Sequence, residues 1–205
     1  MAYAAGSVPE SFSLLIAAHA ESCTRCRTAT VQAEMLGADL LEALPPAAMA
    51  DGRLTQLWKM IDETASPEKA EPRRLAVHGL PGVLSPLFPD GLKAVKWRTL
   101  VPGIQQHQLI DVESGAGSAR LLRIARGVNI PEHTHLGSEL TLILQGSYSD
   151  ETGKFECGDL SDADSSVQHR PVVDSEQPCI CLVATDERLM FSGALQRMIQ
   201  PLLGI

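Results

Sequence analysis

The chain has 205 residues, which suits one large domain or two small ones, and its 44% apolar residues are enough for a packed core. The formal net charge is −8 and the sequence has no basic block, which argues against nucleic acid as a direct partner. No apolar run is long enough to span a bilayer, and the N-terminal stretch lacks the basic start of a signal peptide, so a cytoplasmic protein is expected.

Two helices are expected near the N-terminus. Ser7-Val8-Pro9-Glu10 has the pattern of a capping box, with Ser7 as N-cap and Glu10 at the third helical position. The first helix is therefore predicted to follow Ser7 and to reach His19. A second helix is predicted from about Thr24 to Leu44, where a double proline stops it.

A third helix is predicted from Asp51 to about Ala65. Four of its apolar side chains fall at positions i, i+3, i+4 and i+7, a spacing that places them on one face of a helix. These residues are Leu54, Leu57, Trp58 and Ile61. The stripe is either internal core or a surface that a partner covers.

The chain changes character after the helices. The polar segment SPEKAEPRR, residues 66–74, contains two prolines and is interpreted as a linker, and residues 79–91 are expected to lie along the surface of the next unit. From Leu92 onward, short β-prone runs alternate with turn residues, a pattern typical of an all-β sandwich or barrel. We therefore predict an α+β chain of two domains: a small helical bundle over residues 1–66, a linker and lead-in over 67–91, and a β domain over 92–205.

The stretch HAESCTRC carries a dense group of metal ligands. His19, Cys23 and Cys26 have the spacing H-x3-C-x2-C, which brings one imidazole and two thiolates within reach of a single ion, either on one helix face or at a helix end. Nitrogen and sulfur donors select zinc over hard cations. The alternative is a redox CxxC, which normally opens a helix after a strand, whereas this motif lies between two helices. A zinc site is therefore expected.

A second ligand group lies in GVNIPEHTHLGSELTLILQG, residues 127–146, which reads G-x5-H-x-H-x3-E-x6-G. His133 and His135 are two apart and would point to the same side of a strand, and Glu139 follows on the next strand. The pattern looks like the first cupin motif. That resemblance implies a cupin-type antiparallel β-barrel, or jelly roll, with His169 of a weaker second motif as the fourth ligand. Three histidines and one glutamate suit Zn, Mn, Fe or Ni.

Cys179 and Cys181 stand at i and i+2 in PCICLVA, so they share one face of a predicted strand. Two interpretations remain open. Buried cysteines are usually inert packing residues. If their face points into the barrel, the pair could instead sense oxidants or electrophiles close to the metal.

The H-x3-C-x2-C motif between two helices, within AYAAGS and LLIAAHAESCTRCR, resembles the ChrR-type zinc-dependent anti-sigma factors. A helical anti-sigma domain, a linker and a cupin, in this order, are that family's architecture. The resemblance implies a protein that binds and inhibits an extracytoplasmic-function sigma factor and releases it under singlet oxygen or related oxidative stress. Regulation of transcription, without catalysis, is the expected function.

The resemblance also implies four ligands for the N-terminal zinc: an early histidine and then the trio His19, Cys23 and Cys26. No histidine precedes His19. We therefore expect that the chain starts at an internal methionine or lacks its true N-terminus; otherwise water or a carboxylate such as Glu21 would complete a weak site.

The apolar stripe on the third helix would extend the sigma-binding surface, because helices so short and few do not form a self-sufficient core. The alternative function is a metal-dependent cupin enzyme, dioxygenase-like, or a small-molecule sensor. In that interpretation the N-terminal helices would be an accessory to the cupin.

Overall fold

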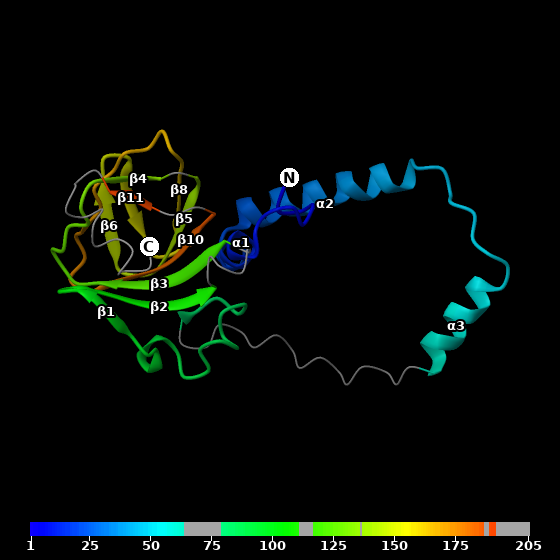
Figure 1. The fold of residues 1–205 in the computed structure, drawn as a ribbon, viewed down its shortest axis with the longest axis horizontal. Coiled ribbons are helices and arrows are strands. Elements are labelled where there is room, and N and C mark those ends of the chain that lie inside the picture. The colour runs from blue at the N-terminus through cyan, green and yellow to red at the C-terminus, as the bar shows by residue number, and fades with distance from the viewer. Residues whose placement is uncertain (64–78, 111–116, 136, 187–188, 192–205) are drawn as a thin grey trace.

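The computed structural model describes residues 1–63, 79–110, 117–135, 137–186 and 189–191 (Figure 1). Its N-terminal part contains helices α1 (Glu10–Ser22), α2 (Thr24–Glu42) and α3 (Arg53–Glu63), which confirms the three predicted helices. The predicted linker at residues 66–74 lies outside the described residues. None of the described helices is long and apolar enough to cross a membrane.

The predicted capping box does not form. Helix α1 begins at Glu10, and Pro9 occupies the N-cap position with ψ of 152° and no side-chain cap. The Ser7 hydroxyl instead donates to the carbonyl of Ala2 at 3.1 Å. The extended backbone of Pro9 separates Ser7 from the helix, so Glu10 is the first helical residue rather than the third.

Helix α1 packs on the β domain, whereas α2 and α3 project away from it (Figure 1). Phe12, Leu15 and Ala18 lie three residues apart and are buried against the sheet. Helices α2 and α3 have no buried residue. Within the helical part, therefore, only α1 packs into a core, and the apolar side chains of α2 and α3 are not buried.

Over its described residues the β domain is antiparallel, as predicted, and forms three sheets. The six-stranded sheet has the order β1-β2-β3-β10-β5-β8, the three-stranded sheet the order β7-β6-β9, and β11 pairs with β4. A short 3₁₀ helix, η2 (Leu92–Ala94), precedes the strands. Their bounds are β1 Arg98–Val101, β2 Ile104–Ile110, β3 Ser118–Ile124, β4 His133–His135, β5 Glu139–Gln145, β6 Ser147–Asp150, β7 Gly153–Glu156, β8 Leu160–Ala163, β9 Val172–Val173, β10 Cys179–Thr185 and β11 Leu189–Phe191.

The central strands β5 and β10 of the six-stranded sheet are buried on both faces. Leu142 of β5 and Leu182 of β10 are paired and face α1, in the core that also holds Leu121. The alternate residues Ile143 and Cys181 face the other way, into a second core between the sheets. This alternation places one row of β5 and β10 side chains inside the barrel.

Residues 79–91 were expected to lie along the surface, but three of their side chains also belong to the core. Leu80, Leu84 and Phe88 are buried in the core that α1 shares with the sheet. Their spacing of four residues suits the turns over this segment, in which the Ser85 amide donates to the Pro81 carbonyl at 3.2 Å. The segment thus covers the end of α1 and joins it to the β domain.

Candidate metal centres

Three predicted ligands of the β domain come together inside the barrel. His133 lies on β4, Glu139 opens β5, and His169 forms an isolated bridge with His133. One ligand atom of each lies within 4.8 Å of the others, and all three side chains are buried. The structure therefore brings two imidazoles and a carboxylate to one point, although the residues are up to 36 positions apart.

The hydrogen bonds of the two histidines fit a metal ion. His133 Nδ1 lies 2.9 Å from the carbonyl oxygen of Pro131, and His169 Nδ1 lies 2.9 Å from Asp150 Oδ2. Both partners accept, so each Nδ1 carries a proton and each Nε2 is the nitrogen that faces a metal ion or a shared proton. The two Nε2 atoms face each other at 3.1 Å. Two lone pairs at this distance repel unless a cation or a proton lies between them.

Burial sets the charges of this cluster. It lowers the pKa of His133 to about 4, so the imidazole is neutral at pH 7, which is the form that binds metal. Burial also raises the pKa of Glu139, while the hydroxyl of Thr141 donates to its carboxylate at 3.2 Å. A buried carboxylate with a raised pKa gains most from a nearby cation, which would hold it ionised.

His135 is the fourth predicted ligand of this cluster. It ends β4, and its backbone pairs with Leu189 of β11. Its side chain lies outside the described residues, so its role as a ligand stays a prediction.

The sequence interpretation missed Asp150, which lies at the end of β6. Burial alone would raise its pKa, but hydrogen bonds from Thr152 and His169 outweigh burial and lower it. Its second oxygen accepts from the Thr152 hydroxyl at 2.6 Å and from the Thr152 amide at 2.8 Å. Asp150 therefore stays ionised and holds the imidazole of His169 in the orientation that points Nε2 at the cluster.

Replacing Asp150 with asparagine is expected to weaken metal binding in the cupin about 10- to 100-fold, because an amide no longer fixes the imidazole by a charged hydrogen bond. Metal competition with a chromogenic chelator measures this loss. Asp164→Asn is the matched control, since Asp164 makes the same turn contacts with the amide and hydroxyl of Ser166 at 2.8 and 2.6 Å. Equal affinity in both variants would remove Asp150 from the site.

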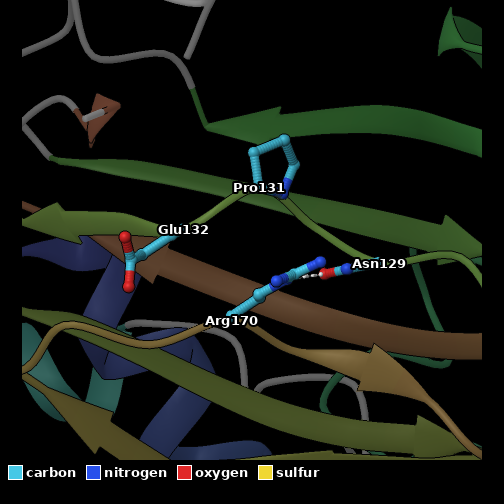
Figure 2. Close-up of a pocket in the computed structure, with 4 residues that line it drawn as sticks. All are labelled: Asn129, Pro131, Glu132 and Arg170. Carbon is cyan, nitrogen blue, oxygen red and sulfur yellow. Dashed lines mark hydrogen bonds between the residues drawn. The ribbon is translucent and has the colours of Figure 1, made fainter. Parts of the chain in front are cut away.

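An open polar cleft of about 380 Å³ adjoins the barrel cluster (Figure 2). Pro131 and Glu132 line it just before His133, and Arg170 lines it just after His169. The Nε of Arg170 donates to Asn129 Oδ1 at 2.9 Å, across the cleft wall. The cleft thus borders the backbone that carries two of the ligands.

The N-terminal trio also comes together. His19 lies in the last turn of α1, Cys23 is the one residue between α1 and α2, and Cys26 lies in the first turn of α2. Their ligand atoms lie within 4.8 Å of one another. Cys23 has an extended backbone, with φ of −94° and ψ of 103°, so the helix-end geometry applies rather than one continuous helix face.

The two thiols are unequal. The backbone amide and the thiol of Cys26 both donate to Cys23, which lowers the pKa of Cys23. Burial, followed by the neighbouring Cys23, raises the pKa of Cys26. Cys23 is thus the readier thiolate, and one imidazole with two sulfurs is a donor set that zinc prefers.

The suggestion that Glu21 completes this site is wrong. Its two carboxylate oxygens accept the backbone amides of Gly82 at 2.5 Å and Val83 at 2.8 Å. Those bonds direct the carboxylate to the segment after residue 79 and away from the thiols. Among the residues that the structure describes, the N-terminal group contains three ligands.

Cys179 and Cys181 face the inner core, on the same side of the sheet as Ile143 and Glu139. Both are buried, as the packing interpretation requires. The Cys181 thiol donates to Cys179, which lowers the pKa of Cys179 and, together with burial, raises that of Cys181. The Glu139 carboxylate also raises the pKa of Cys181, though less than Cys179 and burial do.

Comparisons with known proteins identify the family. A family model described as "ChrR Cupin-like domain" matches residues 91–188. The Anti-sigma-E factor ChrR of Cereibacter sphaeroides is 39% identical over 200 residues, which span 98% of this chain and 92% of the relative. This chain belongs to the ChrR family of anti-sigma factors. The family prediction made from the two motifs is confirmed.

The crystal structure of Rhodobacter sphaeroides SigE in complex with the anti-sigma ChrR also matches. It covers 90% of this chain and 93% of the solved chain, with 38% identity and a TM-score of 0.73. KdgF from Halomonas sp. is 21% identical over 46% of this chain and 89% of its own, with a TM-score of 0.39. The ChrR-family arrangement of N-terminal helices before a cupin-like domain thus extends over nearly the whole chain.

Proposed function

We propose that this chain captures an extracytoplasmic-function sigma factor with α2 and α3 and thereby withholds it from RNA polymerase. One observation carries the proposal: most of the large apolar side chains that the described residues expose lie between residues 31 and 61. They are Val31, Met35, Leu36, Leu40, Leu41, Leu44, Met49, Leu54, Leu57, Trp58, Met60 and Ile61.

A surface of this kind calls for a covering partner, because contiguous apolar patches on soluble proteins mark interaction sites. Helix α3 keeps its polar side chains on the other face, where Lys59 and Glu63 form an exposed ion pair at 3.7 Å. The sigma factor as occupant is supported by the related ChrR, which was solved in complex with SigE. Action on a sigma factor implies that the protein works in the cytoplasm.

Metal ions have structural roles in this proposal. Zinc at His19, Cys23 and Cys26 would fix the junction between α1 and α2. Because α1 is packed on the sheet, that junction sets the direction in which α2 projects. A transition metal, Zn or else Mn, Fe or Ni, would be held by His133, Glu139, His169 and the fourth predicted ligand His135. The proposed units remain the helical part over 1–66, the linker over 67–91 and the cupin over 92–205.

Release under singlet oxygen or related oxidative stress is the proposed regulation. The thiols of Cys179 and Cys181, beside the barrel cluster, are the candidate sensing groups. The alternative, a dioxygenase-like cupin enzyme, rests on the intact cluster of two histidines and one glutamate. Oxygen-dependent turnover of a dicarbonyl compound, lost in His133→Ala, would favour that alternative.

Co-expression with the sigma factor of a neighbouring gene tests the proposal. We expect the two chains to elute as one complex in size exclusion and the complex to contain bound zinc. Transcription from the sigma factor's promoter should be inhibited in vitro as the chain is added. Separate elution of a metal-loaded chain, with transcription unchanged, would contradict the proposed function.

A further inference from the structure

The imidazole of His19 connects the two halves of the molecule. Its Nδ1 lies 3.1 Å from the carbonyl oxygen of Gly158, which is 139 residues further along the chain. Gly158 lies in the turn between β7 and β8, and its φ of +95° favours glycine. A ligand of the N-terminal trio therefore has its hydrogen-bond partner in the cupin.

This contact fixes which nitrogen of His19 can bind a metal. A carbonyl oxygen only accepts, so Nδ1 carries the proton and donates it to Gly158. The lone pair then resides on Nε2. Metal-binding histidines generally donate the N–H of their second ring nitrogen to such an acceptor. Loss of the acceptor weakens metal binding about 10- to 100-fold.

The turn that supplies the acceptor is anchored on β5. The Gly158 amide donates to the Ile143 carbonyl at 2.9 Å, and the Ile143 amide donates to the Asp159 carbonyl at 3.1 Å. The side chain of Asp159 closes the turn by accepting the Glu156 amide at 2.8 Å. Strand β5 opens with Glu139 of the barrel cluster, so one strand joins the two metal-ligand groups.

A second contact holds the same end of α1. Glu21, two residues after His19, accepts the amides of Gly82 and Val83. Segment 79–91 is anchored in the sheet core through Leu80 and Leu84. The end of α1 is therefore hydrogen-bonded both to the cupin turn, through His19, and to segment 79–91, through Glu21.

We propose that the turn Cys157–Asp159 of the cupin is a working part of the N-terminal metal site, because it orients His19 through the Gly158 carbonyl. Metal binding and docking of the end of α1 on the cupin then stabilise each other by the same factor, since thermodynamic linkage is reciprocal. A change in the cupin that moves the turn lowers metal affinity at the helix junction. This inference rests on the proposed N-terminal metal site and does not depend on the sigma factor.

The first experiment changes the turn in the full-length chain. An added Cβ at Gly158 finds its nearest atom, Ser22 Oγ, 4.0 Å away, so Gly158→Ala has room, yet its positive φ is strained and the turn must relax. Titration with Co²⁺, followed by the thiolate-to-cobalt absorption band, reports the cysteine site alone. We expect affinity to fall about 10-fold or more.

Gly127→Ala is the matched control. Gly127 has φ of +72° and open space around its Cβ position, and its amide is bonded to Val173 rather than to the turn. The control carries the same kind of backbone strain and is expected to bind Co²⁺ as the wild type does. Wild-type affinity in Gly158→Ala would overturn the inference. A wild-type chain with no thiolate band would instead contradict the proposed metal site itself.

The second experiment measures the reverse effect. Hydrogen exchange at the amides of Gly82 and Val83 reports docking, because the Glu21 carboxylate protects them only when α1 is in place. We expect these amides to exchange faster after metal removal. In His19→Asn the amide nitrogen takes the place of Nδ1 as donor while the metal-binding nitrogen is lost, so exchange should no longer respond to metal. Exchange that is equally slow in metal-loaded and metal-free wild type would also overturn the inference.

Discussion

Replacing Cys23 and Cys26 together with alanine is expected to weaken sigma-factor binding by about a hundredfold or more while the cupin stays folded. Both sulfurs of the trio disappear, and an imidazole alone does not hold a structural zinc ion, whose apparent binding free energy in small domains is about 10–16 kcal/mol. Helix α2 starts at Thr24, directly after Cys23, so a metal ion held by the trio would fix its direction. Without the metal ion, sigma-factor binding must also order the junction between α1 and α2, and this entropic cost lowers the affinity.

Isothermal titration with the sigma factor and metal analysis of the free chain measure the two effects. The double variant should lack one metal ion per chain and retain the circular dichroism of the β domain. Ser165→Ala is the control: Ser165 is an exposed side chain of similar size on the cupin surface and belongs neither to the trio nor to the turn Cys157–Asp159. A metal-free double variant that binds the sigma factor as tightly as wild type would refute a metal-organised interface.

The elements of this fold could be predicted because their signals are local. Apolar spacing identified α3, the double proline limited α2, and alternation with turn residues identified the β domain. The start of α1 was misplaced by two residues, because Ser7 has an acceptor in Ala2 that a capping pattern does not reveal. The role of Leu80 and Leu84 in the core was missed for the same kind of reason, since their partners lie on α1 and the sheet.

The candidate ligands could be named from the sequence, and the groups that position them could not. Spacings such as H-x3-C-x2-C carry the chemistry within a few residues. Asp150 and Gly158 act on His169 and His19 from 19 and 139 residues away, through contacts that only the folded chain creates. The sequence also did not reveal which face of the sheet carries Cys179 and Cys181. Strand β10 is buried on both faces, so its residues do not alternate between apolar and polar in a way that marks the inner face.

Replacing Trp58 with alanine is expected to lower sigma-factor affinity about 30- to 1000-fold, the range for a central aromatic side chain of an interface. Trp58 is 57% exposed in the free chain and lies on the same face of α3 as Leu54 and Ile61. A side chain this exposed contributes little to folding, so the thermal unfolding midpoint of the free chain should stay unchanged. A large loss of affinity with unchanged stability is the signature of a docking surface, whereas a core residue would lower both.

Lys59→Ala is the matched control for Trp58→Ala, because Lys59 is the next residue on α3 and its side chain is 75% exposed on the polar face. It loses only a surface ion pair with Glu63, and such pairs contribute little. Fluorescence anisotropy with labelled sigma factor compares the two variants with wild type. If both bind equally well, α3 lies outside the interface and the open apolar side chains of α2, from Val31 to Leu41, must carry the capture alone. If only Trp58→Ala is weakened, the stripe that the sequence spacing singled out is the surface that holds the sigma factor.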